Sequence, residues 1–167
     1  SPDSRYLAFF TSRQLKKIPV AGGPAQLICE ANGADGTWGA NGTILFDGNS
    51  SDSIRQVPAS GGVATAATVI DREAGETYHA WPWFLPDGNR FLYLASTNDA
   101  SGTGNTWLLK IGSLDGEIDT EIGPIASRCV FVEGDHILFG QDGLLLQQQI
   151  DLDNGALTIA SITTADA

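Results

Sequence analysis

One short pattern recurs four times along this 167-residue chain, and it limits the folds that the chain can adopt. Each copy contains an apolar strand candidate that carries one aromatic residue: Leu7-Ala8-Phe9, Ile44-Leu45-Phe46, Phe91-Leu92-Tyr93 and Ile137-Leu138-Phe139. The four aromatic residues stand 37, 47 and 46 positions apart. Repeats of this length are typical of similar supersecondary units that pack side by side and cover one another.

The residues on both sides of these strands repeat as well. A turn rich in Asp, Asn and Gly precedes each strand: Pro2-Asp3-Ser4, Ala40-Asn41-Gly42, Pro86-Asp87-Gly88 and Glu133-Gly134-Asp135. A second apolar strand follows, marked by Ile18, Val57, Ile111 and Ile150, and a glycine comes five residues after each mark: Gly23, Gly62, Gly116 and Gly155. Since glycine supplies the positive φ of tight hairpin turns, this constant offset predicts a repeated hairpin.

A further strand candidate precedes the turn in repeats two to four only: Thr37-Trp38, Trp81-Pro82-Trp83-Phe84 and Cys129-Val130-Phe131. We therefore expect the chain to be part of a longer protein and to begin between the first and second strands of a unit. Four strands in forty-odd residues are typical of a β-propeller blade. The predicted fold is all-β, a propeller segment of about four four-stranded antiparallel blades with the first incomplete, in repeats 1–34, 35–76, 77–125 and 126–167.

Two segments, SPDSRYLAF at 1–9 and LPDGNRFLYL at 85–94, resemble the WD-repeat-like blades of TolB-type propellers. The segment HAWPWFLPDGNRFLY at 79–93 is similar to blades attached to bacterial receptor-type Ser/Thr kinases. The resemblance implies a non-catalytic sensor or scaffold module of a larger bacterial protein that binds a protein, a peptide or a small ligand. Together with the low cysteine content, it favours a periplasmic or other extracytoplasmic location.

Charge excludes one class of partner. Nine Lys and Arg stand against 20 Asp and Glu, a net charge of −11, so nucleic acid is not expected to bind. Residues 111–167 carry −9 and the other 110 residues only −2. This field would attract a cationic protein or peptide, although a solvated acidic flank explains it equally well.

Motifs of catalysis and metal binding are absent from the sequence. The two histidines, His79 and His136, lie in different repeats, and no hydrolase elbow, phosphate loop or kinase signature occurs. The Gly102-Thr103-Gly104 segment lacks a third glycine, and Asp151-Leu152-Asp153-Asn154 has its glycine one place early for a calcium loop. Cys29 and Cys129 fit no metal spacing and are expected to be buried apolar side chains. We predict no catalytic residue, no metal and no cofactor.

The candidate ligand-binding residues lie on the face where connections vary in length. In up-and-down blades this face receives the second-to-third strand connections and the links between blades, including 97–105 and 71–79. We expect His79, Trp81, Trp83, Asn98, Asp99 and Asn105 to bind there. Strand alternation places His79, Trp81 and Trp83 on one side and Phe84 on the other, with Pro82 in an innermost or bulged strand. Two alternatives stay open: the tryptophans fill the core between blades, or the loops bind nothing.

Unpaired blades at the two ends leave apolar faces that something must cover. Further blades, a homodimer that closes the propeller, or a tight four-bladed ring would each cover them. The alternative to a binding module is the propeller domain of a prolyl-oligopeptidase-type peptidase or of another enzyme, with its catalytic domain elsewhere.

Overall fold

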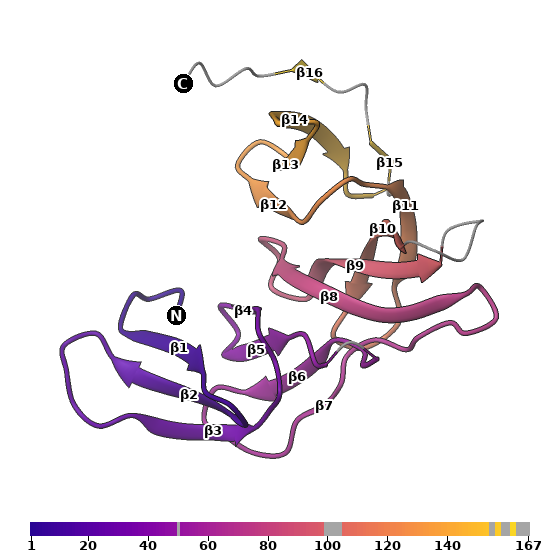
Figure 1. Cartoon of the computed structure of the whole chain (residues 1–167). Coiled ribbons are helices and arrows are strands. Elements are labelled where there is room, and N and C mark those ends of the chain that lie inside the picture. Colours follow the sequence, from indigo (N-terminus) through magenta and orange to yellow (C-terminus); the bar gives the residue numbers. More distant parts are fainter. Residues whose placement is uncertain (50, 99–104, 154–155, 158–160, 163–167) are drawn as a thin grey trace.

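The structure is a computed structural model that describes residues 1–49, 51–98, 105–153, 156–157 and 161–162. Within these residues the chain forms strands and turns, with no helix. The strands form four antiparallel sheets that follow one another along the chain and in space, as Figure 1 shows. The predicted all-β, propeller-like class is confirmed.

The four sheets are named in chain order. Sheet 1 contains β1 (Tyr6–Phe10), β2 (Gln14–Pro19) and β3 (Gln26–Glu30). Sheet 2 contains β4 (Gly36–Trp38), β5 (Thr43–Phe46), β6 (Arg55–Pro58) and β7 (Thr65–Ala66). Sheet 3 contains β8 (Glu76–Phe84), β9 (Arg90–Asn98), β10 (Asn105–Ser113) and β11 (Asp119–Pro124). Sheet 4 contains β12 (Cys129–Val132), β13 (His136–Gln141), β14 (Leu144–Asp151), β15 (Ala156–Leu157) and β16 (Ser161–Ile162).

The repeated turns share one backbone conformation. The third residue of each predicted turn has a positive φ: Ser4 at 57°, Gly42 at 82°, Gly88 at 72° and Asp135 at 57°. The hairpin glycines Gly23, Gly62 and Gly116 also have positive φ, whereas Gly155 lies outside the described residues. The turn pattern in the sequence therefore reports a real repeated geometry, because only a few residue types adopt this conformation at low cost.

An apolar core lies between each pair of neighbouring sheets. Leu15, Ile44 and Val57 belong to the core of sheets 1 and 2, and Leu45, Ile54 and Phe91 to that of sheets 2 and 3. Leu92, Leu109 and Ile137 belong to the largest core, between sheets 3 and 4. Alternation along each strand thus supplies one side chain to one neighbour and the next to the other.

Both cysteines belong to these cores. Cys29 and Cys129 are buried and free, as the sequence predicted. Burial raises the pKa of the Cys129 thiol to about 12, because an apolar environment disfavours the thiolate. We therefore assign both thiols to packing.

The strand that contains Pro82 is bulged, as Pro82 predicted, and the bulge changes the alternation expected for one residue. Ala80 pairs with Leu94 and Trp83 pairs with Leu92, so one extra residue is inserted in β8. Trp81 takes up this residue with φ at 53°, which is rare for an aromatic residue. The expected alternation is confirmed for Trp81 and Trp83, which pack on the core of sheets 3 and 4, and for Phe84, which packs on that of sheets 2 and 3. It is wrong for His79, whose ring packs on Tyr93 on the side of sheet 2, because the extra residue in β8 lies between His79 and the tryptophans.

Candidate functional site

Two adjoining clefts on the face of the inter-sheet links form the best candidate site. The larger, about 550 Å³, lies between sheets 1 and 2, and six polar side chains line it: Arg13, Glu30, Asn32, Asn49, Asp52 and Arg55. The smaller, about 180 Å³, lies between the β5–β6 connection and β8. Gly48 and Asn49 line both clefts, so the two adjoin at these residues. We call this surface the loop-face site.

The connection between β5 and β6 lies between the two clefts, and hydrogen bonds of the buried Asp47 hold it in place. The buried Asp47 accepts hydrogen bonds through Oδ1 from the amides of Ala34 and Asp35, both at 2.9 Å. Its own amide donates to the carbonyl of Asp35 at 3.1 Å. A Cβ at Gly48 would lie 2.5 Å from the Cβ of Asp52, so this position requires glycine. The site is therefore preorganised by its backbone.

Both signs of charge line the larger cleft. Arg55 donates to the carbonyl of Ala64 at 3.0 Å and lies 3.8 Å from the carboxylate of Asp52. Glu30 accepts a hydrogen bond from Gln14 at 2.9 Å. The guanidinium of Arg13 is exposed and has no partner among the described residues. The cleft thus offers a free cation, a carboxylate and amide groups around an apolar floor that includes Phe46.

An aromatic cluster stands beside the smaller cleft. The rings of Trp81 and Trp107 lie 4.7 Å apart, and Tyr78 meets Trp107 edge-on at 5.3 Å. Tyr78 and Trp81 line the cleft, and all three rings are half-buried. Their partial exposure at the end of an inter-sheet core is suited to stacking on a ligand.

A buried polar network lies behind the smaller cleft, between sheets 2 and 3. The His79 ring contacts Thr68 Oγ1 through Nδ1 at 2.7 Å and Glu76 Oε2 through Nε2 at 2.9 Å. Lys110 Nζ donates to Glu76 Oε1 at 2.8 Å and lies 3.0 Å from Asp119 Oδ1. Tyr93 donates to the same Asp119 oxygen at 2.6 Å. Sheet 3 supplies five of these six residues, and Thr68 comes from the link after β7.

The surroundings set the protonation of this network. Burial lowers the pKa of His79 despite the neighbouring Glu76, so the imidazole is neutral near pH 7. Burial opposes ionisation of Glu76, but hydrogen bonds from Lys110 and the Asp71 amide outweigh it and hold that pKa below its ordinary value. Burial acts against the charge on Lys110 as well, yet Glu76 and Asp119 keep its pKa raised. The network is thus an ion pair with a neutral histidine attached.

The order Thr68, His79, Glu76 resembles a nucleophile–base–carboxylate relay, and the histidine at its centre is fully buried. Neutral His79 donates through Nε2 to the Glu76 carboxylate, so its Nδ1 accepts from the Thr68 hydroxyl. Thr68 Oγ1 accepts in turn from the amide of Ile54 at 3.0 Å. The His79 side chain is 0% exposed, whereas Thr68 is partly exposed and lines neither cleft of the loop-face site.

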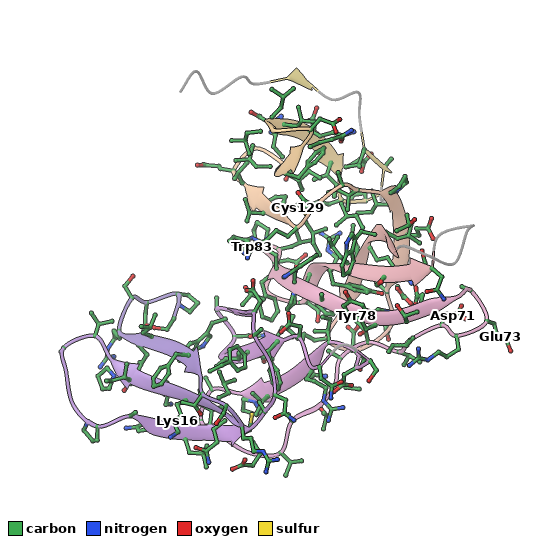
Figure 2. The ribbon with its side chains drawn as sticks, viewed as in Figure 1. Lys16, Asp71, Glu73, Tyr78, Trp83 and Cys129 are labelled. Carbon is green, nitrogen blue, oxygen red and sulfur yellow. The ribbon has the colours of Figure 1, made fainter. Side chains whose placement is uncertain are left out.

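The predicted binding residues are only partly brought together. His79 and Trp81 both border the smaller cleft, although His79 belongs to the buried network. Trp83 is directed away from it, into the core of sheets 3 and 4 beside Cys129, as Figure 2 shows. Asn98 is exposed at the end of β9 and pairs through its backbone with Asn105, and Asp99 lies outside the described residues.

Sequence reasoning missed most of the site. Arg13, Asn49 and Arg55 lie in connections or at a strand end and carry no motif, and Glu76, Lys110 and Asp119 are separated by 34 and 9 positions. Trp107, whose ring packs against Trp81, was not predicted, and its place in the apolar strand marked by Ile111 was the one signal available. In the described part of the chain no group of three or more metal-ligating side chains occurs, and no helix is long and apolar enough to cross a membrane.

Comparison with known proteins supports the fold alone. No family profile and no curated protein sequence matches the chain. A luciferin-regenerating enzyme is similar in structure, with a TM-score of 0.68 at 10% identity over 97% of this chain and 57% of that one. A Mycobacterium tuberculosis puromycin-hydrolyzing peptidase gives 0.63 at 14% identity, over 89% of this chain and 28% of that one. An ancestral GH74 enzyme gives 0.60 at 13% identity, over 93% and 23%. This chain therefore spans little more than half, or about a quarter, of these proteins.

Proposed function

We propose that this chain is a non-catalytic binding module and that its loop-face site binds an extended peptide segment of a protein partner. The observation that supports this most is that the two clefts adjoin at Gly48 and Asn49. A peptide presents amide groups, charged side chains and apolar side chains in succession. The two clefts together offer a partner for each: Asn32 and Asn49, then Arg13 and Glu30, then the ring of Trp81.

The absence of catalysis in the proposal is supported by the use of the titratable groups. The histidine, carboxylate and lysine that stand closest together are His79, Glu76 and Lys110, and each is buried and bonded to another. A general base needs access to a substrate proton, and each of these three residues is at most 7% exposed. The resemblance to blades of receptor-type kinases supports a place for the module in a larger sensor protein.

A second function is favoured by the structural similarity to the puromycin-hydrolyzing peptidase. In this alternative the chain is the propeller part of a prolyl-oligopeptidase-type enzyme or of another propeller enzyme, and the catalytic domain lies outside it. The loop-face site would then hold substrate and not a signalling partner.

A peptide display experiment tests the binding proposal. The probe is a library of random dodecapeptides displayed on phage, selected on the immobilised chain. We expect the selected peptides to lose at least about tenfold in affinity for a variant with Arg13→Ala and Asn49→Ala, as expected for about 1.4 kcal/mol of lost contacts. The matched control is Arg5→Ala, an exposed arginine away from both clefts, which should bind as the wild type does.

Two outcomes would contradict the binding proposal. One is a selection without enriched peptides, and the other is peptides that bind the double variant as tightly as the wild type. A separate screen with aminoacyl p-nitroanilides and p-nitrophenyl glycosides tests catalysis. Turnover by this chain alone would overturn the non-catalytic part of the proposal.

A further inference from the structure

A buried hydroxyl without a hydrogen-bond partner lies in sheet 3, close to the loop-face site. Ser96 is 0% exposed, and its Oγ atom has no partner among the described residues. A hydroxyl that folding removes from water and leaves unpaired destabilises the folded state. Because native structures pair nearly all such groups, this hydroxyl indicates a partner that the described residues do not supply.

Two aromatic rings cover this hydroxyl. Ser96 pairs with Tyr78 on one neighbouring strand and with Trp107 on the other. Directly paired residues point to the same face of a sheet, so the three side chains form one row across β8, β9 and β10. The rings of Tyr78 and Trp107 meet edge-on at 5.3 Å, above the serine between them, and Trp81 packs on Trp107 at 4.7 Å. We call Ser96 and these three rings the aromatic subsite.

The Tyr78 ring is the part of this cover that can move. Its side chain, labelled in Figure 2, is half-buried, and its hydroxyl forms no hydrogen bond with any described residue. Rotation of the side chain would therefore break a ring contact and no hydrogen bond. Because the ring both lines the smaller cleft and covers Ser96, such a rotation would connect the two.

The composition of the subsite indicates the chemistry that fits it. Aromatic faces stack on flat rings, and a hydroxyl at the base pairs with one polar group. The Tyr78 ring shows that the space beside Trp107 accepts a phenol. Among the side chains of a peptide, tyrosine combines this ring with a hydroxyl at its far end. A tryptophan would be larger than the ring that it replaces, and a phenylalanine would leave Ser96 unpaired.

We propose that the aromatic subsite binds a tyrosine side chain of the partner peptide. The Tyr78 ring turns away from Trp107, the ring of the ligand takes its place, and the hydroxyl of the ligand hydrogen-bonds to Ser96 Oγ. This inference rests on the proposed function, because the tyrosine belongs to the peptide in the loop-face site. The serine hydroxyl is already out of water in the free protein, so the new bond gains more than one formed between two solvated groups.

Two small probes that differ by one hydroxyl test this selection, N-acetyl-tyrosinamide and N-acetyl-phenylalaninamide. Each is titrated into the isotope-labelled chain, and binding is followed by the indole N–H signals of Trp81 and Trp107, assigned with Trp81→Phe and Trp107→Phe. We expect the tyrosine probe to bind about fivefold more tightly, which corresponds to about 1 kcal/mol for one net hydrogen bond. Ser96→Ala should remove this difference by weakening the tyrosine probe alone.

A buried serine whose hydroxyl is paired provides the matched control. Ser113, at the other end of β10, is 1% exposed, and its hydroxyl donates to Asp115. Ser113→Ala should keep the difference between the probes and lower the urea midpoint. Ser96→Ala should leave the midpoint unchanged or raise it, because it removes an unpaired hydroxyl. Tyr78→Ala should bind both probes more tightly than the wild type does, because the missing ring leaves space for them.

The possible outcomes separate this inference from the proposed function. Equal binding of the two probes, no binding of either probe, or a difference that persists in Ser96→Ala would each overturn the inference. Enriched dodecapeptides without a common tyrosine would support the proposed function and contradict the inference. Conversely, selective binding of the tyrosine probe with no enriched peptide would support the subsite and contradict the proposed function.

Discussion

The two faces of sheet 3 pack on the neighbouring sheets through different kinds of side chain. Toward sheet 4, Leu92, Leu94, Leu109 and Ile111 meet the apolar side chains of β12 to β14. Toward sheet 2, Phe91 and Tyr93 share the boundary with Glu76, His79 and Lys110, all buried. One sheet thus presents hydrocarbon on one face and an ion pair with a neutral histidine on the other.

The two boundaries therefore contribute differently to the stability of the fold and to its geometry. Apolar packing stabilises in proportion to buried area and accepts many arrangements of similar volume. A buried ion pair adds little net stability, but it is costly to break because the remaining charge is buried away from water without a partner. The ion pair lies within sheet 3, and His79 extends the network to Thr68 in the link after β7, behind the loop-face site. We therefore expect the boundary of sheets 2 and 3 to accept fewer arrangements than the apolar boundary does.

Among the changes considered, removal of Lys110 at the boundary of sheets 2 and 3 should lower the free energy of unfolding most. We expect Lys110→Met to lower the free energy of unfolding by about 3 to 5 kcal/mol at pH 7, because Glu76 is left charged and buried. Urea unfolding followed by tryptophan fluorescence measures this. The control is Lys17→Met, whose half-buried ammonium donates to the carbonyl of Ala59, with an expected loss of about 1 kcal/mol. Equal losses would contradict the proposed role of the network.

Truncation in the apolar boundary should cost somewhat less. Leu109→Ala removes a fully buried side chain between sheets 3 and 4, and we expect a loss of about 3 kcal/mol. Leu144→Ala, at a 42% exposed position of sheet 4, should change stability by less than about 1 kcal/mol. The same urea titrations compare the pair. If Leu109→Ala were as mild as Leu144→Ala, the boundary would not be the close-packed core described above.

Acidification should weaken the polar boundary in a defined direction. The folded pKa of His79 lies below its ordinary value of 6.5, so below that pH the unfolded chain takes up a proton before the folded one. Stability should therefore fall from about pH 6.5 downward, by at most about 1.4 kcal/mol per pH unit for one proton. Glu76 adds a fall in the same direction below 4.5. Urea midpoints from pH 7.5 to 5 in a His136→Gln background test this, and a flat profile would count against a neutral His79.

The smallest effect should come from an exposed ion pair. Arg128 and Asp35 join sheets 4 and 2 at 2.7 Å, but the arginine side chain is 52% exposed. We expect Arg128→Ala to cost about 0.5 kcal/mol and the loss to vanish at high salt. Thermal melts in low and high salt compare it with Lys110→Met. A loss above 2 kcal/mol would mean that this pair also helps to fix the arrangement of sheets 2 and 4.

The fold was largely predictable because its signals are local. Turns at Ser4, Gly42, Gly88 and Asp135 need a conformation that few residues adopt, so the sequence marks them directly. The apolar strands next to these turns form at the predicted positions in all four sheets. The incomplete first blade corresponds to the three strands of sheet 1.

The site was much less predictable. Two of the expected binding residues, His79 and Trp81, border it, but Trp83 does not, because its side chain packs in the core of sheets 3 and 4. Pro82 predicted a bulged strand, but the position of the extra residue, which places His79 on the opposite side from both tryptophans, depends on the pairing with β9. The arginines and amides of the larger cleft come from separate connections, and no local pattern links them.

The sequence by itself determined the repeat, the turns and the all-β class, since these depend on backbone preferences within a few residues. Only the tertiary structure decided which charges meet, because Lys110 reaches Glu76 across 34 positions once β8 and β10 flank β9 in one sheet. It also decided that His79 faces sheet 2, on the opposite side from Trp81 and Trp83. A side chain's partners follow from the register and packing of whole sheets, which no single segment specifies.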